Sequence, residues 1–139
     1  MKMKRFSALI MASICVFLLA CPVLAADTRA SNQINTYTVD VTPSSGNLAV
    51  DFYVAGNSTM TKIGCSSIKV YQKSGSSWSL QASKSESASG MTKTNATSIA
   101  KTMNFNGASG VSYKVVVTVF AENSAGRDSR TVTRYVTGK

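Results

Sequence analysis

Few residues of this chain belong to the types that carry out catalysis. The 139-residue sequence contains no histidine, the commonest general base and a common zinc ligand. Asp40 and Asp51 fall on neighbouring expected strands, both opposite the apolar side, where they could form a carboxylate pair of the kind that glycosidases use. An outward aspartate on a strand is also an ordinary solvated residue. We therefore expect that the protein is not an enzyme, and we keep hydrolysis by Asp40 and Asp51 as an alternative.

The cysteines and acids offer little to a metal or a cofactor. Cys15 and Cys21 lie in the N-terminal apolar stretch, so Cys65 is the one thiol of the remaining chain. Without a histidine to draw off its proton, Cys65 is expected to be a small buried residue rather than a nucleophile. The acids are also too widely spaced for a calcium-binding loop, which needs them at alternate positions. No metal and no cofactor are expected.

Positive charge is the feature with the most functional content. The chain carries a net charge of +9, and Lys114, Arg130 and Arg134 lie near its C-terminus. A basic surface of this kind could contact an anionic cell-wall polymer or another protein at the cell surface. Single-stranded nucleic acids are usually bound by aromatic side chains interleaved with the charges, and only Tyr135 meets that description, so nucleic acid is not expected. The alternative is that the charge serves solubility alone.

The first 25 residues have the three-part layout of a secretory signal peptide. A basic start (Lys2, Lys4 and Arg5) precedes a run of about 15 mostly apolar residues, which is shorter than the ~20 residues a membrane-spanning helix needs. Cleavage is expected between Ala25 and Ala26, and no transmembrane segment is expected in the mature chain. Leu18-Leu19-Ala20-Cys21 is similar to a lipobox, so lipidation of Cys21 is the alternative. The protein is thus expected to be secreted, or held at the cell surface by a lipid.

Two-residue alternation of apolar and polar side chains recurs after residue 35 and predicts strands. We expect a flexible segment at 26–34 and one domain at 35–139. About seven antiparallel strands are predicted, separated by Gly/Ser turns, with 48–54 and 68–71 counted as separate strands. Residues 84–95 are expected to form an exposed loop or a frayed edge, and 92–101 at most one helical turn. The predicted core includes Val50, Phe52, Trp78, Val117 and Val119.

One stretch carries a resemblance to a known family. Tyr113, the alternating valines after it and Ala121-x-Asn123-x-x-Gly126 resemble the sixth strand of fibronectin type III domains. The tyrosine lies farther from Ala121 than it does in that family. The resemblance implies an all-β fold, a seven-stranded immunoglobulin- or fibronectin-III-like β-sandwich.

A second resemblance concerns the whole mature chain. Arg29-Ala30-Ser31, Tyr37, the stretch Met60 to Gly64 and Ile68-x-Val70-Tyr71 look like small secreted proteins of clostridia-like Gram-positive bacteria. That group carries no assigned activity, so this resemblance bears on compartment and fold alone.

These patterns together favour a secreted, non-catalytic, monomeric module that binds or interacts at the cell surface. Tyr53 and Tyr71 are predicted to point away from the apolar side of their strands, where they could stack on sugar rings or pack across strands.

Overall fold

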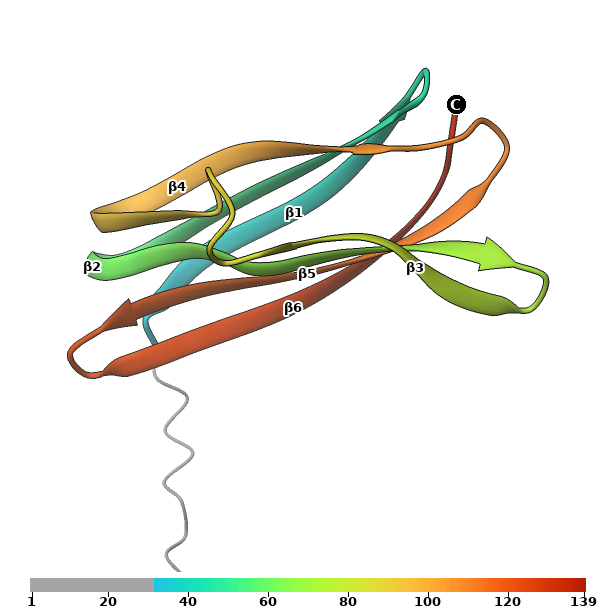
Figure 1. The fold of residues 1–139 in the computed structure, drawn as a ribbon. Helices are drawn as coiled ribbons and strands as arrows, with labels where there is room; N and C mark the ends of the chain where they lie inside the picture. The colour runs from blue at the N-terminus through green and yellow to red at the C-terminus, as the bar shows by residue number, and fades with distance from the viewer. Residues whose placement is uncertain (1–31) are drawn as a thin grey trace, which may run out of the picture.

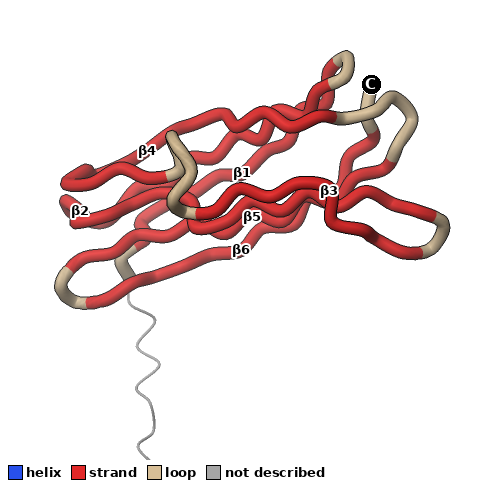
Figure 2. Tube along the Cα trace, viewed as in Figure 1, coloured by secondary structure: helices blue, strands red, loops and turns tan. Residues whose placement is uncertain are grey.

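The computed structural model describes residues 32–139, which form six β-strands and no helix (Figures 1 and 2). The strands are β1 (Ile34–Ser44), β2 (Asn47–Ser74), β3 (Ser77–Ser85), β4 (Thr92–Asn106), β5 (Ser112–Asn123) and β6 (Gly126–Thr137). The predicted signal peptide, its cleavage site at Ala25 and Ala26, and Cys21 lie outside the described residues. The all-β class is as predicted, and all strand pairs are antiparallel.

The prediction of seven strands is wrong because β2 is one long strand that includes both of the strands predicted at 48–54 and 68–71. Its first part pairs with β1 on one side and with β4 on the other. Its last part pairs with β3 and β5, and β5 in turn pairs with β6. Lys62, Ile63 and Gly64 pair with both β4 and β5, so this is where β2 exchanges one set of neighbours for the other.

This exchange curls the sheet around a core (Figure 1). β1 comes to lie beside β6, where the Arg134 Nε donates a hydrogen bond of 3.0 Å to the Val39 carbonyl. Apolar side chains of all the strands meet inside the curl, and the largest fully buried ones there are Leu48, Met60, Ile63, Ile68 and Met91. Among the predicted core residues, Val50, Phe52, Val117 and Val119 are buried as expected, whereas Trp78 is half-exposed.

The link between β3 and β4 also differs from the prediction. Residues 86–91 link β3 to β4 along the same side of β2, and the Cys65 N–H next to Gly64 donates a hydrogen bond of 2.8 Å to the Met91 carbonyl. Met91 is fully buried, and β4 begins directly after it at Thr92. The segment predicted as an exposed loop or frayed edge therefore supplies a core residue. No helical turn forms within 92–101.

The two ends of the described chain lie at opposite ends of the domain (Figure 1). Gln33 accepts a side-chain hydrogen bond of 2.6 Å from Asn123, at the turn between β5 and β6. At the other end, the carbonyl of Lys139 accepts a hydrogen bond of 3.2 Å from the Gly46 N–H in the turn between β1 and β2.

Candidate functional site: an aromatic and basic sheet face

The three basic residues singled out by the sequence do not share one surface. In the pairing of β5 with β6, Arg130 lies opposite Val119 and Arg134 opposite Val115, and both valines point into the core. Lys114 lies opposite Tyr135 and so belongs to the outer face of the sheet. Because successive strand residues point to opposite sides, Lys114 is separated from the two arginines by the sheet itself.

Both arginines have partners along the edge of β6. The Arg130 guanidinium bonds the carboxylate of Asp128, a side chain only 4% exposed, and the Ser129 carbonyl. Arg134 holds the Val39 carbonyl of β1 and lies 3.9 Å from the carboxylate of Asp40. These contacts tie the edge of β6 to itself and to β1.

Lys114 instead belongs to a group that we call the aromatic–lysine face: Tyr71 and Lys73 of β2, Trp78 of β3, Lys114 of β5 and Tyr135 of β6. The strand register produces this group. Tyr71 pairs with Lys114, Lys114 with Tyr135, and Lys73 with Trp78. Four strands therefore each contribute at least one side chain to one patch on the outer face.

The rings and ammonium groups of this face are in contact. The Lys114 Nζ lies 4.6 Å from the centre of the Tyr71 ring and 5.4 Å from that of Trp78. The Lys73 Nζ lies 5.9 Å from the Trp78 ring. Trp78 and Tyr135 are 5.8 Å apart and tilted by 55°. All these distances fall within the range of cation–π and aromatic pairing, so the face is pre-arranged.

The aromatic–lysine face is open to solvent. Tyr135 is 67% exposed, and the neighbouring Leu80, which pairs with Tyr71, is 55% exposed. Beside the rings lies a shallow hollow of about 330 Å³, lined by Lys73, Trp78, Ser112, Tyr113, Tyr135, Val136 and Thr137. The hydroxyls of Ser112 and Thr137, on directly paired residues, can exchange hydrogen bonds with a ligand there.

The lysines of this face have no acidic partner among residues 32–139. Glu86 pairs with Lys62 at 2.6 Å and with Arg127 at 2.7 Å, and Glu122 also pairs with Arg127. Lys114 and Glu122 lie on the same strand eight residues apart, about 27 Å at ~3.4 Å per residue. That separation exceeds the screening length of roughly 8–10 Å at physiological salt, so the positive charge of the face is not cancelled locally.

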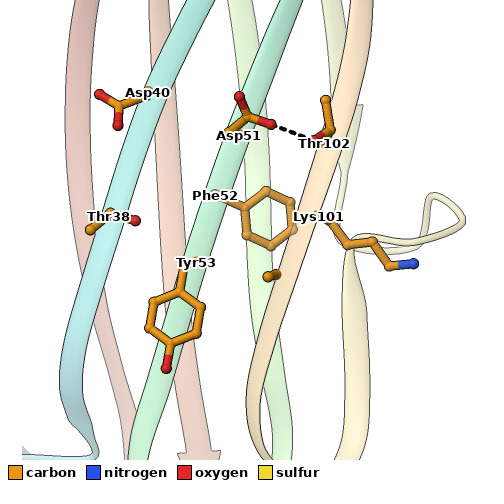
Figure 3. A pocket seen from close by; sticks show the side chains of 8 residues that line it. Thr38, Asp40, Asp51, Phe52, Tyr53, Lys101 and Thr102 are labelled. Atoms are coloured by element: carbon orange, nitrogen blue, oxygen red, sulfur yellow. Dashed lines mark hydrogen bonds between the residues drawn. The ribbon is translucent and has the colours of Figure 1, made fainter.

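Asp40 and Asp51 lie on the other outer face of the curled sheet (Figure 3). They pair directly across β1 and β2, the neighbouring strands on which the sequence placed them. They line a hollow of about 350 Å³ with Thr38, Phe52, Tyr53, Ala100, Lys101 and Thr102. Asp51 accepts a hydrogen bond from the Thr102 hydroxyl, while the side chain of Asp40 is 76% exposed. The acid of a glycosidase pair is usually shielded from water, and Asp40 lacks such shielding.

Cys65 is buried completely, and its thiol donates to the Ser67 carbonyl at 3.2 Å. Burial raises the pKa of this thiol to about 12, because the thiolate would lose its hydration. The thiol therefore stays protonated and unreactive at neutral pH, in agreement with a structural role.

The sequence pointed to Lys114 and Tyr71 but missed their association with Trp78 and Tyr135. The reason is a bulge on β3. Val70 pairs with Ala82 and Tyr71 with Leu80, so Gln81 is an extra residue. The alternation of Trp78, Leu80 and Ala82 suggests one inward side, but the bulge leaves only Ala82 inward. The signal that could have been used is the lysine and serine content around Trp78, which is unusual for a core strand.

The chain was compared with protein-family models, curated proteins and solved structures, and none of these comparisons found a match. Within residues 32–139 no helix is long and apolar enough to cross a membrane. The same residues contain no group of three or more cysteines and acids arranged to hold a metal ion.

Proposed function

We propose that this chain is an exported, non-catalytic binding module that holds an anionic polymer of the cell envelope through its aromatic–lysine face. The observation that carries the proposal is the position of Lys73 and Lys114: both ammonium groups lie against half-exposed aromatic rings and have no carboxylate partner among the described residues. An anion at this face gains charge attraction without first displacing an internal ion pair.

The proposal includes an immunoglobulin- or fibronectin-III-like sandwich as the scaffold. Two features support it. The two parts of β2 pair with different neighbours, as separate strands of such a sandwich would. The Tyr113 hydroxyl accepts a hydrogen bond of 2.7 Å from the Ala108 N–H, five residues upstream, which is the contact of a tyrosine corner.

Anchoring through a lipidated Cys21 is a second form of the same proposal, and the position of the aromatic–lysine face relative to the described N-terminal end is compatible with it. The N-terminal end of the described chain lies at the β5–β6 turn. Tyr135 is nine residues along β6 from Gly126, about 30 Å away at ~3.3 Å per residue. The N-terminal end of the described chain and Tyr135 thus lie toward opposite ends of β6.

Hydrolysis by Asp40 and Asp51 is the alternative from another functional class. The direct pairing of the two residues and the hollow beside them support it. Asp51→Asn would abolish such an activity and leave envelope binding unchanged, because Asp51 lies on the opposite outer face from Lys114.

Salt elution from isolated bacterial cell walls tests the main proposal. The double variant Lys73→Met, Lys114→Met should elute at clearly lower salt than the parent, because ionic attraction is screened over ~10 Å at 0.1 M and only ~3 Å at 1 M. The matched control is Lys93→Met, Lys101→Met, which removes two exposed lysines from β4. Equal elution of the two double variants would mean that net charge, and not this face, holds the protein to the wall.

A further inference from the structure

We infer that the ligand of the aromatic–lysine face is a polysaccharide whose sugar rings themselves carry carboxylate groups, as uronic acids do. This inference rests on the proposed function and specifies its ligand. It depends on two separate contributions of the face: the rings of Trp78 and Tyr135 offer apolar area, and Lys73 and Lys114 offer positive charge within 6 Å of the Trp78 ring centre.

The apolar area of the two rings needs a ring-shaped partner. Trp78 and Tyr135 are tilted by 55° with their centres 5.8 Å apart, so together they form a shallow angle rather than a slot between parallel plates. A sugar ring can rest one apolar face on the indole of Trp78 and touch Tyr135 with its edge. Parallel stacking of consecutive nucleobases would need rings side by side in one plane, which this tilt does not provide.

The positive charge of the two lysines needs an anion close to that ring. Both ammonium groups lie within 6 Å of the Trp78 ring centre, at 5.4 Å for Lys114 and 5.9 Å for Lys73. A carboxylate attached to a sugar stacked on Trp78 would sit at the rim of the indole, within reach of these lysines. A polymer with its charge in flexible links between rings would not keep stacking and ion pairing in this fixed relation.

The hollow beside the rings supplies the polar contacts that a sugar requires. Its volume of about 330 Å³ is at the lower end of the ~300–1,000 Å³ typical of ligand sites. Ser112 and Thr137 bring hydroxyls to it from paired positions on β5 and β6. Lys69, two residues before Tyr71 on β2, adds an exposed ammonium where a longer chain would continue over the face.

Three polymers separate the two contributions in a binding measurement with the mature chain. Polygalacturonate has both the ring and the carboxylate, its fully methyl-esterified form keeps the ring without the charge, and polyglutamate keeps the carboxylate without the ring. Calorimetry or affinity electrophoresis should show that polygalacturonate binds at least about tenfold more tightly than either of the other two polymers, since each of those two lacks either the charge or the sugar ring.

Two variants and one control assign the contributions to residues. Trp78→Ala should weaken polygalacturonate binding about tenfold, and Lys114→Met about fivefold with a reduced dependence on salt. Tyr53→Ala, a half-exposed tyrosine on the opposite outer face, should leave binding within about twofold. Thermal melts of each variant check that the fold is retained.

The outcomes also separate this inference from the proposed function. Equal binding of polyglutamate and polygalacturonate would overturn the ring-borne carboxylate but leave a module that binds anionic polymers. Equal binding of the methyl ester and of polygalacturonate would overturn the claim that the lysines bind the carboxylate groups. Tighter binding of single-stranded poly(dT) would replace the polysaccharide by a nucleic acid. Failure to bind isolated cell walls as well as all of these polymers would overturn the proposed function itself.

Discussion

Replacement of Gly64 by alanine tests how the link between β3 and β4 is held against β2. Gly64 lies where β2 exchanges neighbours, and it pairs with Thr92 at the start of β4, directly after residues 86–91. A methyl group at this position would come 2.1 Å from the Met91 carbonyl oxygen and 2.7 Å from the Thr92 Cα. Ordinary contacts begin near 3.4 Å, so the loop backbone has to move by more than 1 Å.

The cost follows from what that movement breaks. The Cys65 N–H would lose its hydrogen bond of 2.8 Å to Met91, and an unpaired buried N–H costs about 1–3 kcal/mol. Met91, now fully buried, would be lifted partly out of the core, and overpacking of this kind typically costs about 1–3 kcal/mol. Because the two losses overlap, we expect Gly64→Ala to lower the free energy of unfolding by about 3 kcal/mol.

Urea denaturation followed by the fluorescence of Trp78 measures this change. Gly75→Ala is the matched control, because Gly75 also has a positive φ (+62°) but has nothing within 4 Å of an added methyl group. It should cost only about 1 kcal/mol, the strain of a left-handed alanine. The double variant Gly64→Ala, Met91→Ala should lose less than the sum of its two single variants, since each of them removes buried contacts of the Met91 side chain. A loss below about 1 kcal/mol for Gly64→Ala would refute the close approach of the Met91 backbone to Gly64.

Further predictions concern stability, pH and reactivity. Phe52→Ala should cost about 3–5 kcal/mol in urea melts, because Phe52 is only 2% exposed and would leave a cavity. The hydrogen bond from Arg127 lowers the pKa of Glu86 below its ordinary value of 4.5. The ionised Glu86 therefore stabilises the fold fully at pH values above 4.5, and this stabilisation is lost as the pH falls through the lowered pKa. Glu86→Gln should therefore be less sensitive to acid than the parent; an unchanged pH profile would contradict this. Arg134→Met should lose about 1 kcal/mol because it removes the hydrogen bond from β6 to β1, whereas an exposed arginine without such a bond would cost under about 0.5 kcal/mol. Cys65 should resist a thiol reagent at pH 8 until urea unfolds the chain, and rapid labelling of the native protein would be inconsistent with its burial.

The sequence was a good guide wherever one apolar side alternates without interruption. The inward set of β5, from Tyr113 through Val115, Val117 and Val119, is buried as the two-residue period predicts. The hairpin at Gly75 also forms where Gly and Ser residues interrupt the alternation. In both places local propensity and tertiary burial favour the same structure, and the sequence alone is then sufficient.

The prediction failed where the chain continues through a turn-like segment. Because 48–54 and 68–71 were predicted as separate strands, Ala55-Gly56-Asn57-Ser58 was expected to form a loop after the first of them. The chain stays extended there and passes the irregularity as a bulge between Ala55 and Met60. Because both ends of β2 are fixed by long-range pairing, tertiary contacts override the local preference for a turn.

The candidate site could not be predicted from the sequence for a related reason, which concerns the register of strand pairing rather than local structural propensity. Arg130 and Arg134 are close to each other in sequence, but alternation with Thr131 and Thr133 sends both to the side of Val132, toward β1. Lys114 alternates with Val115 and is sent to the outer side, where Tyr71 and Tyr135 reach it from strands 43 and 21 residues away. Basic residues that all lie near the C-terminus are thus divided by the sheet, while residues far apart in sequence are joined on one of its faces. The chemistry of a β-sheet face is a property of its register, and a bulge such as that at Gln81 can move a tryptophan from the expected core to the surface where a ligand can reach it.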